Sequence, residues 1–303
     1  MYELHYGLRE MPFGLTPNTA FFLNTRGHRE AFDLLMVAIA GGEGFVKVVG
    51  EVGTGKTMLC RKLLNSLDSE RYHTAYIPNP FLNPEALFRA MLEDLGEKRI
   101  PQRRTFHELQ KRLHDLLIEQ ARNNRQVVLV IDEAQAIPAK TLEALRLISN
   151  LETETRKLVQ IVLFGQPELD RLLGMNEFRQ LRQRIGFSYR LPPLMREEAS
   201  AYIEHRLRAA GYSGAKLFDN SALELLYRAT QGVPRLINIL AHKALLSAYG
   251  KGQKHIQKPH VLAAIRDTEG VRMPSLWTRL VANWFMPAVL LINFCDSITG
   301  SLT

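Results

Sequence analysis

Residues 50–57 carry the chemistry that is easiest to recognise in this chain. They spell Gly-Glu-Val-Gly-Thr-Gly-Lys-Thr, the spacing of a loop that binds the phosphates of a nucleoside triphosphate. Glycines at three of these positions let the backbone turn several N–H groups toward one anion, at a helix N-terminus whose dipole favours negative charge. Lys56 is expected to reach the β- and γ-phosphates, and the Thr57 hydroxyl is expected to bind Mg²⁺. The residues expected to bind the nucleotide here are Gly50, Glu51, Val52, Gly53, Thr54, Gly55, Lys56, Thr57 and Met58.

The segments on either side of this loop have the periodicity that the motif requires. Residues 45–49 form a short apolar run rich in β-formers, and residues 58–67 place leucines at helical spacing. A strand followed by the loop and then a helix is the context in which the motif binds phosphate. A glycine-rich turn that matches by chance is the alternative, and this context argues against it.

A pair of acidic residues follows the most apolar stretch of the chain. Residues 127–131, Val-Val-Leu-Val-Ile, are typical of a strand buried on both faces of a parallel sheet, and Asp132 and Glu133 come directly after it. Ligands bind at this edge of open α/β sheets. We interpret Asp132 as the residue that holds Mg²⁺ or its water, and Glu133 as the base that deprotonates the attacking water. The pair alone is a weak signal, but together with the phosphate loop it is a strong one.

A glutamine and a group of arginines follow in the next strand–helix unit. Gln166 comes just after the apolar run 159–164, so it is placed at the same sheet edge as Asp132. It either contacts the γ-phosphate or caps the following turn. The arginines at 171, 179, 182 and 184 precede the last expected strand, 185–191. A guanidinium there suits a developing phosphoryl charge, and it would act on a neighbouring subunit's nucleotide. We favour Arg184, then Arg182.

Alternating strands and helices over 31–193 predict an α/β domain with a five-stranded parallel sheet, and the strands that carry the two motifs need not be neighbours in it. From 194 to 270 only helical spacing remains, which predicts a small all-helical domain. Arg235 falls in the first turn of one of its helices, where a cation is disfavoured unless it meets a phosphate. Residues 1–30 are rich in aromatics. Phe13 is the expected neighbour of a purine ring, although these aromatics could equally attach the N-terminus to the core.

Composition narrows the class of protein without naming a partner. The chain has 303 residues, 46% hydrophobic and 23% charged, which is ordinary for a globular protein. A formal charge of +8 permits contact with nucleic acid or an anionic membrane, but it does not favour either. Two cysteines, Cys60 and Cys295, exclude a disulfide framework. We expect a cytoplasmic main body, since the N-terminus lacks the pattern of a secretion signal.

The order of these motifs resembles that of an AAA+ ATPase with its helical lid, over about residues 1–270. The motifs are the loop, the acidic pair, Gln166, the arginines and Gly-x-Pro-Arg at 232–235. Several short segments are similar to the general secretion pathway protein A family. They are the opening Tyr-Gly-Leu and Pro-Phe, Ile-Asp-Glu-Ala-Gln at 131–135 and Leu-Phe-Gly-Gln-Pro-Glu-Leu at 163–169. Short members of this family include the ATPase of mannose-sensitive haemagglutinin (MSHA) pilus biogenesis, which the chain resembles in length and ending.

This resemblance implies ATP hydrolysis with Mg²⁺, in a homo-oligomer, coupled to assembly of a type IV pilus or a type II secretion system at the inner membrane. It implies that Gln166 is sensor 1 and Arg235 is sensor 2. Transposition-helper ATPases share much of the pattern, so DNA-associated work stays an alternative. The apolar tail, 271–303, contains an uncharged stretch at 280–295. That stretch is short of the roughly 20 residues a spanning helix needs, so the tail either touches the membrane or docks on protein.

Overall fold

The computed structural model describes residues 2–16, 18–97, 100–101, 105–153 and 156–271. These residues divide into two compact units. One is an α/β unit of Thr16–Leu194 together with Val233–Arg235. The other is helical and takes the described residues within Met1–Leu15, Met195–Gly232 and Leu236–Thr303.

The α/β unit is built on a five-stranded sheet in the order β2-β3-β4-β1-β5, in which every pairing is parallel. The strands are β1 (Phe45–Gly50), β2 (Tyr72–Ile77), β3 (Gln126–Ile131), β4 (Val159–Gly165) and β5 (Ile185–Leu191). The predicted parallel sheet is confirmed. β1 and β3 are the strands that precede the two motifs, and β4 lies between them. A ligand at the carboxyl edge of the sheet can therefore bind between the end of β1 and the end of β3.

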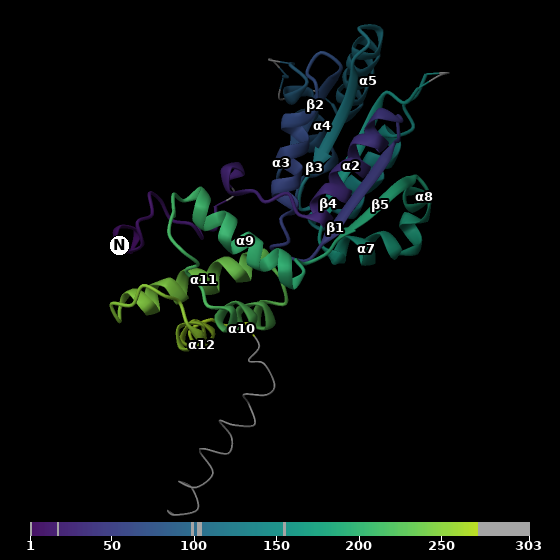
Figure 1. The fold of residues 1–303 in the computed structure, drawn as a ribbon. Helices are drawn as coiled ribbons and strands as arrows, with labels where there is room; N and C mark the ends of the chain where they lie inside the picture. The colour runs from purple at the N-terminus through teal and green to yellow at the C-terminus, as the bar shows by residue number, and fades with distance from the viewer. Residues whose placement is uncertain (1, 17, 98–99, 102–104, 154–155, 272–303) are drawn as a thin grey trace, which may run out of the picture. The chain divides into compact units, whose positions relative to one another are not determined.

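Helices cover both faces of the sheet (Figure 1). Val128 and Val130 of β3 pack in the core formed with α2 (Arg26–Ala40) and α3 (Lys56–Ser66). Alternate residues of the same strand, Leu129 and Ile131, pack in the opposite core. That core includes α4 (Pro84–Asp94), α5 (Phe106–Arg122), α6 (Ala139–Ile148), α7 (Pro167–Gly174) and α8 (Arg179–Gln183). Burial on both faces explains the unbroken apolar run of β3.

Short elements and caps complete this unit. Single 3₁₀ turns lie at η1 (Thr19–Phe21), η2 (Ala134–Ala136) and η3 (Asn176–Phe178). The start of α5 is fixed by a capping box, in which the Thr105 hydroxyl oxygen accepts from the Glu108 N–H and the Glu108 carboxylate accepts from the Thr105 N–H.

The helical unit contains α1 (Glu3–Tyr6), α9 (Arg196–Ala209), α10 (Asn220–Thr230), most of α11 (Pro234–Tyr249) and α12 (Lys258–Arg266). Its N-terminal segment is fixed by hydrogen bonds rather than by apolar packing alone. The buried Arg206 of α9 donates to the carbonyl oxygens of Pro12 and Gly14, at 2.5 and 3.1 Å. The described residues of Met1–Leu15 group with the helical unit, and the α/β unit begins at Thr16. The position of residues 1–30 beside the nucleotide stays a prediction.

The predicted tail, 271–303, lies outside the described residues except for its first position. Among the described residues, no helix combines the length and the apolar character needed to cross a bilayer. The two alternatives for the tail therefore stay predictions.

Candidate functional site

The phosphate loop joins β1 to α3 as the motif requires. Gly53 and Gly55 have φ angles of +82° and +98°, in the region that residues with a side chain rarely adopt. Between them the buried Thr54 turns its hydroxyl back onto the Glu51 carbonyl oxygen at 2.8 Å. The chain then enters α3 with Gly55 as its N-cap, so the loop and the helix N-terminus face the same space.

Lys56 is buried inside this loop, with 5% of its surface exposed. Its Nζ donates to the carbonyl oxygens of Gly50 and Glu51 at 2.8 and 2.9 Å. Burial lowers the pKa of the ammonium group, and the negative charges of Glu133 and Asp132 oppose that shift. The cation is therefore held among backbone oxygens, and Glu133 and Asp132 are the first of four acidic residues that favour its charge, followed by Glu51 and Glu168.

Asp132 lies at the end of β3 with 3% of its surface exposed. Burial raises the pKa of its carboxyl group, while hydrogen bonds from the Thr57 hydroxyl and from the Glu133 backbone N–H lower it. The second of these bonds measures 2.9 Å to Oδ1. The structure thus brings together the two residues expected to bind Mg²⁺.

This pair fits a magnesium ion. Mg²⁺ in nucleotide sites is usually bound through one or two protein oxygens, with water and phosphate oxygens supplying the rest. The Thr57 hydroxyl and the Asp132 carboxylate, which lie close enough for the hydroxyl to lower the pKa of the carboxyl group, would provide that set. Desolvation of Asp132 also favours a bound cation, because a positive charge would stabilise the ionised carboxylate that burial disfavours.

Glu133 has a left-handed backbone, with φ 50° and ψ 37°. Such a conformation costs free energy in a residue other than glycine, and it occurs where the surrounding structure enforces it. The Glu133 carboxylate accepts two hydrogen bonds on Oε2, from Gln135 Nε2 at 2.5 Å and from Gln166 Nε2 at 3.0 Å. Its orientation is therefore fixed by two amides from two strand ends.

Gln135 is part of this site and was not predicted from the sequence. Besides its bond to Glu133, its Oε1 accepts the Gln166 backbone N–H at 2.9 Å. Gln135 thereby ties the segment after β3 to the start of α7. The motif Asp-Glu-Ala-Gln placed it two residues beyond the expected base, but no periodicity or charge pattern indicates that its side chain turns back to Glu133.

The helix that begins next to Gln166 is anchored by an ion-pair network. Asp170 in α7 accepts from Lys47 Nζ of β1 at 2.5 Å and from Arg190 of β5 at 3.2 Å. Lys47 is largely buried, with 14% of its side chain exposed, so its pairing with Asp170 is worth more than a surface contact. Gln166 therefore projects from a helix end that is tied to two strands of the sheet.

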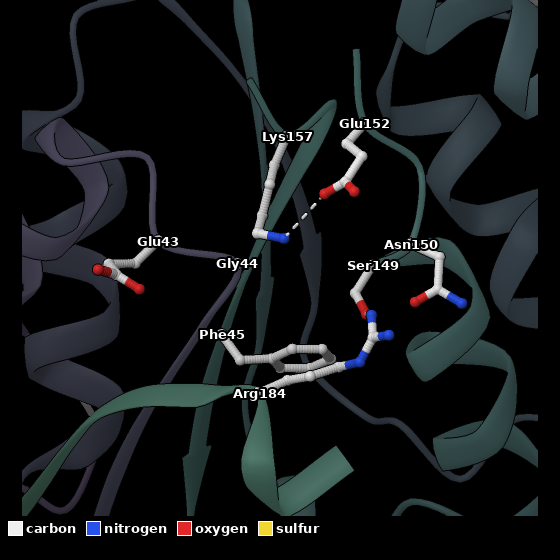
Figure 2. A pocket seen from close by; sticks show the side chains of 8 residues that line it. All are labelled: Glu43, Gly44, Phe45, Ser149, Asn150, Glu152, Lys157 and Arg184. Atoms are coloured by element: carbon white, nitrogen blue, oxygen red, sulfur yellow. Dashed lines mark hydrogen bonds and ion pairs between the residues drawn. The ribbon is translucent and has the colours of Figure 1, made fainter. Parts of the chain in front are cut away.

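Arg184 lies apart from these groups, at the start of β5 and therefore at the opposite edge of the sheet. Its Nη1 donates to the hydroxyl oxygen of Ser149, the C-cap of α6, at 3.0 Å. Figure 2 shows Arg184 reaching Ser149 in a pocket of about 480 Å³ that also contains the ion pair of Lys157 with Glu152. Arg182, the second choice, is exposed and contacts the Gly174 carbonyl oxygen. Action of either arginine on a neighbouring subunit stays a prediction.

Two further predicted residues have clear positions. The backbone N–H of Arg235 donates to the Gly53 carbonyl oxygen at 3.2 Å, so Arg235 is grouped with the phosphate loop. Phe13 is 2% exposed, and its ring meets Phe218 edge-on in the helical unit, with centroids 6.3 Å apart. This contact agrees with the alternative in which the aromatics attach the N-terminus to a core. Contact of Phe13 with a purine stays a prediction.

Comparison with known proteins agrees with this geometry. Residues 39–173 match the model of an AAA domain. The chain is 39% identical over 280 residues to general secretion pathway protein A of Aeromonas hydrophila, which covers 91% of this chain and 50% of that protein. It thus spans half the length of this relative.

Solved structures show the same fold. The ORC2 protein of Aeropyrum pernix, determined as ADPNP–ADP complexes, aligns with a TM-score of 0.61 and 17% identity over 87% of this chain and 74% of that one. Cdc6p of Pyrobaculum aerophilum aligns with a TM-score of 0.62 and 18% identity over 81% and 67%. The matched model, the fold and the curated relative agree: residues 39–173 form an AAA domain, in a chain that is similar to general secretion pathway protein A over 91% of its length.

Proposed function

We propose that this protein binds ATP with Mg²⁺ and hydrolyses it. One observation carries the proposal: the Thr57 hydroxyl of the phosphate loop lies close enough to the buried Asp132 carboxyl to lower its pKa, and Glu133 is the next residue in the chain. A phosphate loop, the residues that would bind the metal and the carboxylate that would act as base are then neighbours at one sheet edge. These are the parts that transfer of a phosphoryl group to water requires.

Each side chain has a distinct task in this mechanism. The loop N–H groups and Lys56 bind the phosphates, and Thr57 and Asp132 would hold Mg²⁺, which neutralises charge on the β- and γ-phosphate oxygens when bound. Glu133 accepts the proton of the attacking water. The two amides on Oε2 leave Oε1 without a hydrogen-bond partner among the described residues, so Oε1 is the oxygen that takes the proton. Gln166, which donates to Glu133 Oε2, would join this base to the γ-phosphate.

Phosphate release from ATP by the purified chain tests this activity. We expect turnover with Mg²⁺ and none after chelation by EDTA, because the phosphate charge is then not neutralised. Lys56→Ala is the control for contaminating ATPases. If the parent chain and this variant released phosphate at the same rate, the proposed hydrolysis would be rejected.

We further propose that hydrolysis drives assembly of a type IV pilus of the MSHA kind or of a type II secretion system, in a homo-oligomer at the inner membrane. The support is the relationship to general secretion pathway protein A. Replacing the chromosomal copy with Glu133→Gln in the source organism tests this role. Loss of surface pili with normal secretion indicates the first system, the reverse indicates the second, and no change in either contradicts both.

A DNA-associated role is the alternative outcome. The +8 charge permits it, but no basic patch was identified from the sequence. Turnover would be measured with and without duplex DNA across a salt series. A stimulation that disappears steeply with added salt would favour the DNA role, because counterion release makes such binding strongly salt-dependent.

A further inference from the structure

A histidine outside the phosphate-loop motif contacts the loop backbone at Thr54. His28 lies in the first turn of α2 with 5% of its surface exposed, and its Nε2 is 3.1 Å from the Thr54 carbonyl oxygen. We propose that His28 is a positioning residue for nucleotide binding, which holds the Thr54–Gly55 peptide so that the Gly55 N–H faces the phosphates. This inference rests on the proposed binding of ATP.

The hydrogen bonds around the ring define its proton positions. A carbonyl oxygen can only accept, so Nε2 must carry the proton that points at Thr54. In the neutral ring Nδ1 is then an acceptor, and it lies 2.6 Å from the Thr25 hydroxyl, which donates to it. Thr25 is the N-cap residue of α2, but its side chain does not cap the helix and instead forms a hydrogen bond with the His28 ring. A buried threonine thus orients a buried histidine toward the loop.

Peptide geometry explains why this contact affects phosphate binding. The C=O and N–H of a trans peptide point in opposite directions from one plane. A Thr54 carbonyl held outward by His28 therefore directs the Gly55 N–H inward, into the concave side of the loop where such N–H groups bind anions. Glycines flank Thr54 on both sides, with φ angles of +82° and +98°, and glycine permits many conformations. A bond from outside the loop restricts this peptide to one of them.

The packing around the ring supports the same conclusion. A Cβ at Gly55 would lie 2.7 Å from His28 Nε2, so the imidazole fills the space that a side chain at position 55 would need. The ring of Phe22 meets His28 edge-on, with centroids 5.2 Å apart. His28 is therefore fixed by a hydroxyl, an aromatic ring and the loop itself, which makes it a rigid support for the loop.

Matched substitutions can separate the hydrogen bond from the volume of the ring. In glutamine the amide Nε2 reaches about the position of the histidine Nε2, whereas asparagine is too short to donate to Thr54. We expect His28→Gln to bind fluorescent ADP within about threefold of the parent. His28→Asn and His28→Leu should bind it about tenfold more weakly, as expected for loss of one hydrogen bond that orders the loop. Thr25→Val should weaken binding less.

Binding of ADP is measured by fluorescence titration of the full chain, and thermal unfolding without nucleotide reports whether each variant folds. Equal weakening in His28→Gln and His28→Asn would overturn the inference, as would parent-like binding by a folded His28→Leu. If His28→Leu does not fold, the comparison of His28→Gln with His28→Asn decides.

Lys56→Ala separates this inference from the proposed function. If the parent binds ADP and Lys56→Ala does not, then normal binding by the His28 variants refutes only the role of His28. If the parent itself does not bind, the proposed function fails.

Discussion

The two edges of the sheet in the α/β unit use their polar residues in different ways. At the carboxyl edge, Lys56, Asp132 and Glu133 are hydrogen-bonded to the loop backbone, to Thr57 and to neighbouring amides. At the amino edge, Arg184 rests on a single neutral hydroxyl at the end of α6. The first edge is a closed network that shapes a nucleotide site. The second offers an arginine for which the described residues provide no ion pair with a carboxylate.

This difference indicates which residues each subunit of an oligomer would contribute to one site of ATP hydrolysis. A single chain places the phosphate loop, the proposed metal-binding pair and the proposed base together, but Arg184 lies at the opposite edge of the same sheet. Because the strands are all parallel, no local rearrangement brings Arg184 to its own loop. The comparison therefore predicts that substitutions at the carboxyl edge affect each chain by itself, whereas substitution of Arg184 affects a neighbour.

The largest effect is expected for Glu133→Gln. The amide keeps the size of the side chain but cannot take a proton from water, so turnover should fall by about 10²–10⁴-fold. Binding of ATP should change little, because Glu133 is not among the groups that bind phosphate. Single-turnover hydrolysis and ATP binding would be measured on the same preparation. Hydrolysis at the parental rate would show that Glu133 is not the base.

Lys56→Ala should act on binding rather than on turnover of bound ATP. The substitution removes a charged donor to the phosphates and leaves two loop carbonyl oxygens without their present partner. Affinity should fall by about 10–100-fold, the range for loss of a charge-assisted hydrogen bond. Titration with a non-hydrolysable ATP analogue measures this directly. Lys62→Ala is the matched control, since that lysine lies on the same helix over Phe22 and Phe32, and its removal should leave affinity unchanged.

The carboxyl edge was largely predictable from the sequence because its signals are local. The glycines and Lys56 follow a strand within a few residues, and the β3 run ends at Asp132, so adjacency in the chain and parallel strands determine where they meet. His28 and Gln135 could not be found in this way. Their roles depend on contacts made by side chains after folding, one of them from a helix before β1. Phe13 shows the same limit, because aromatic character alone does not specify which core receives the ring.

Arg184→Ala should reduce turnover by roughly tenfold and leave ATP affinity of the isolated chain unchanged, because a charge-assisted contact to the transferring group is worth about 1.5 kcal/mol at the lower end of its range. The decisive measurement mixes the two impaired variants. Glu133→Gln supplies an intact arginine to a neighbour, and Arg184→Ala supplies an intact base, so the mixture should turn over ATP faster than the sum of the two variants measured separately. Absence of regain, with oligomers formed, would remove Arg184 from catalysis, and the same mixture with Arg182→Ala then tests the second arginine.

The smallest effect is expected at the amino edge itself, from Ser149→Ala. The Ser149 hydroxyl accepts from Arg184 and donates to the Arg146 carbonyl oxygen at 2.7 Å, so the substitution removes one acceptor and one helix-end bond. We expect a loss of about 1 kcal/mol in the free energy of unfolding, measured in urea, with no change in ATP affinity. Ser66→Ala is the matched control, because Ser66 makes the same kind of bond to the Lys62 carbonyl oxygen on an exposed turn, and its loss should cost less. If Ser149→Ala instead weakened ATP binding in the isolated chain, the two edges would be coupled within one subunit, and the proposed division of work between copies would be wrong.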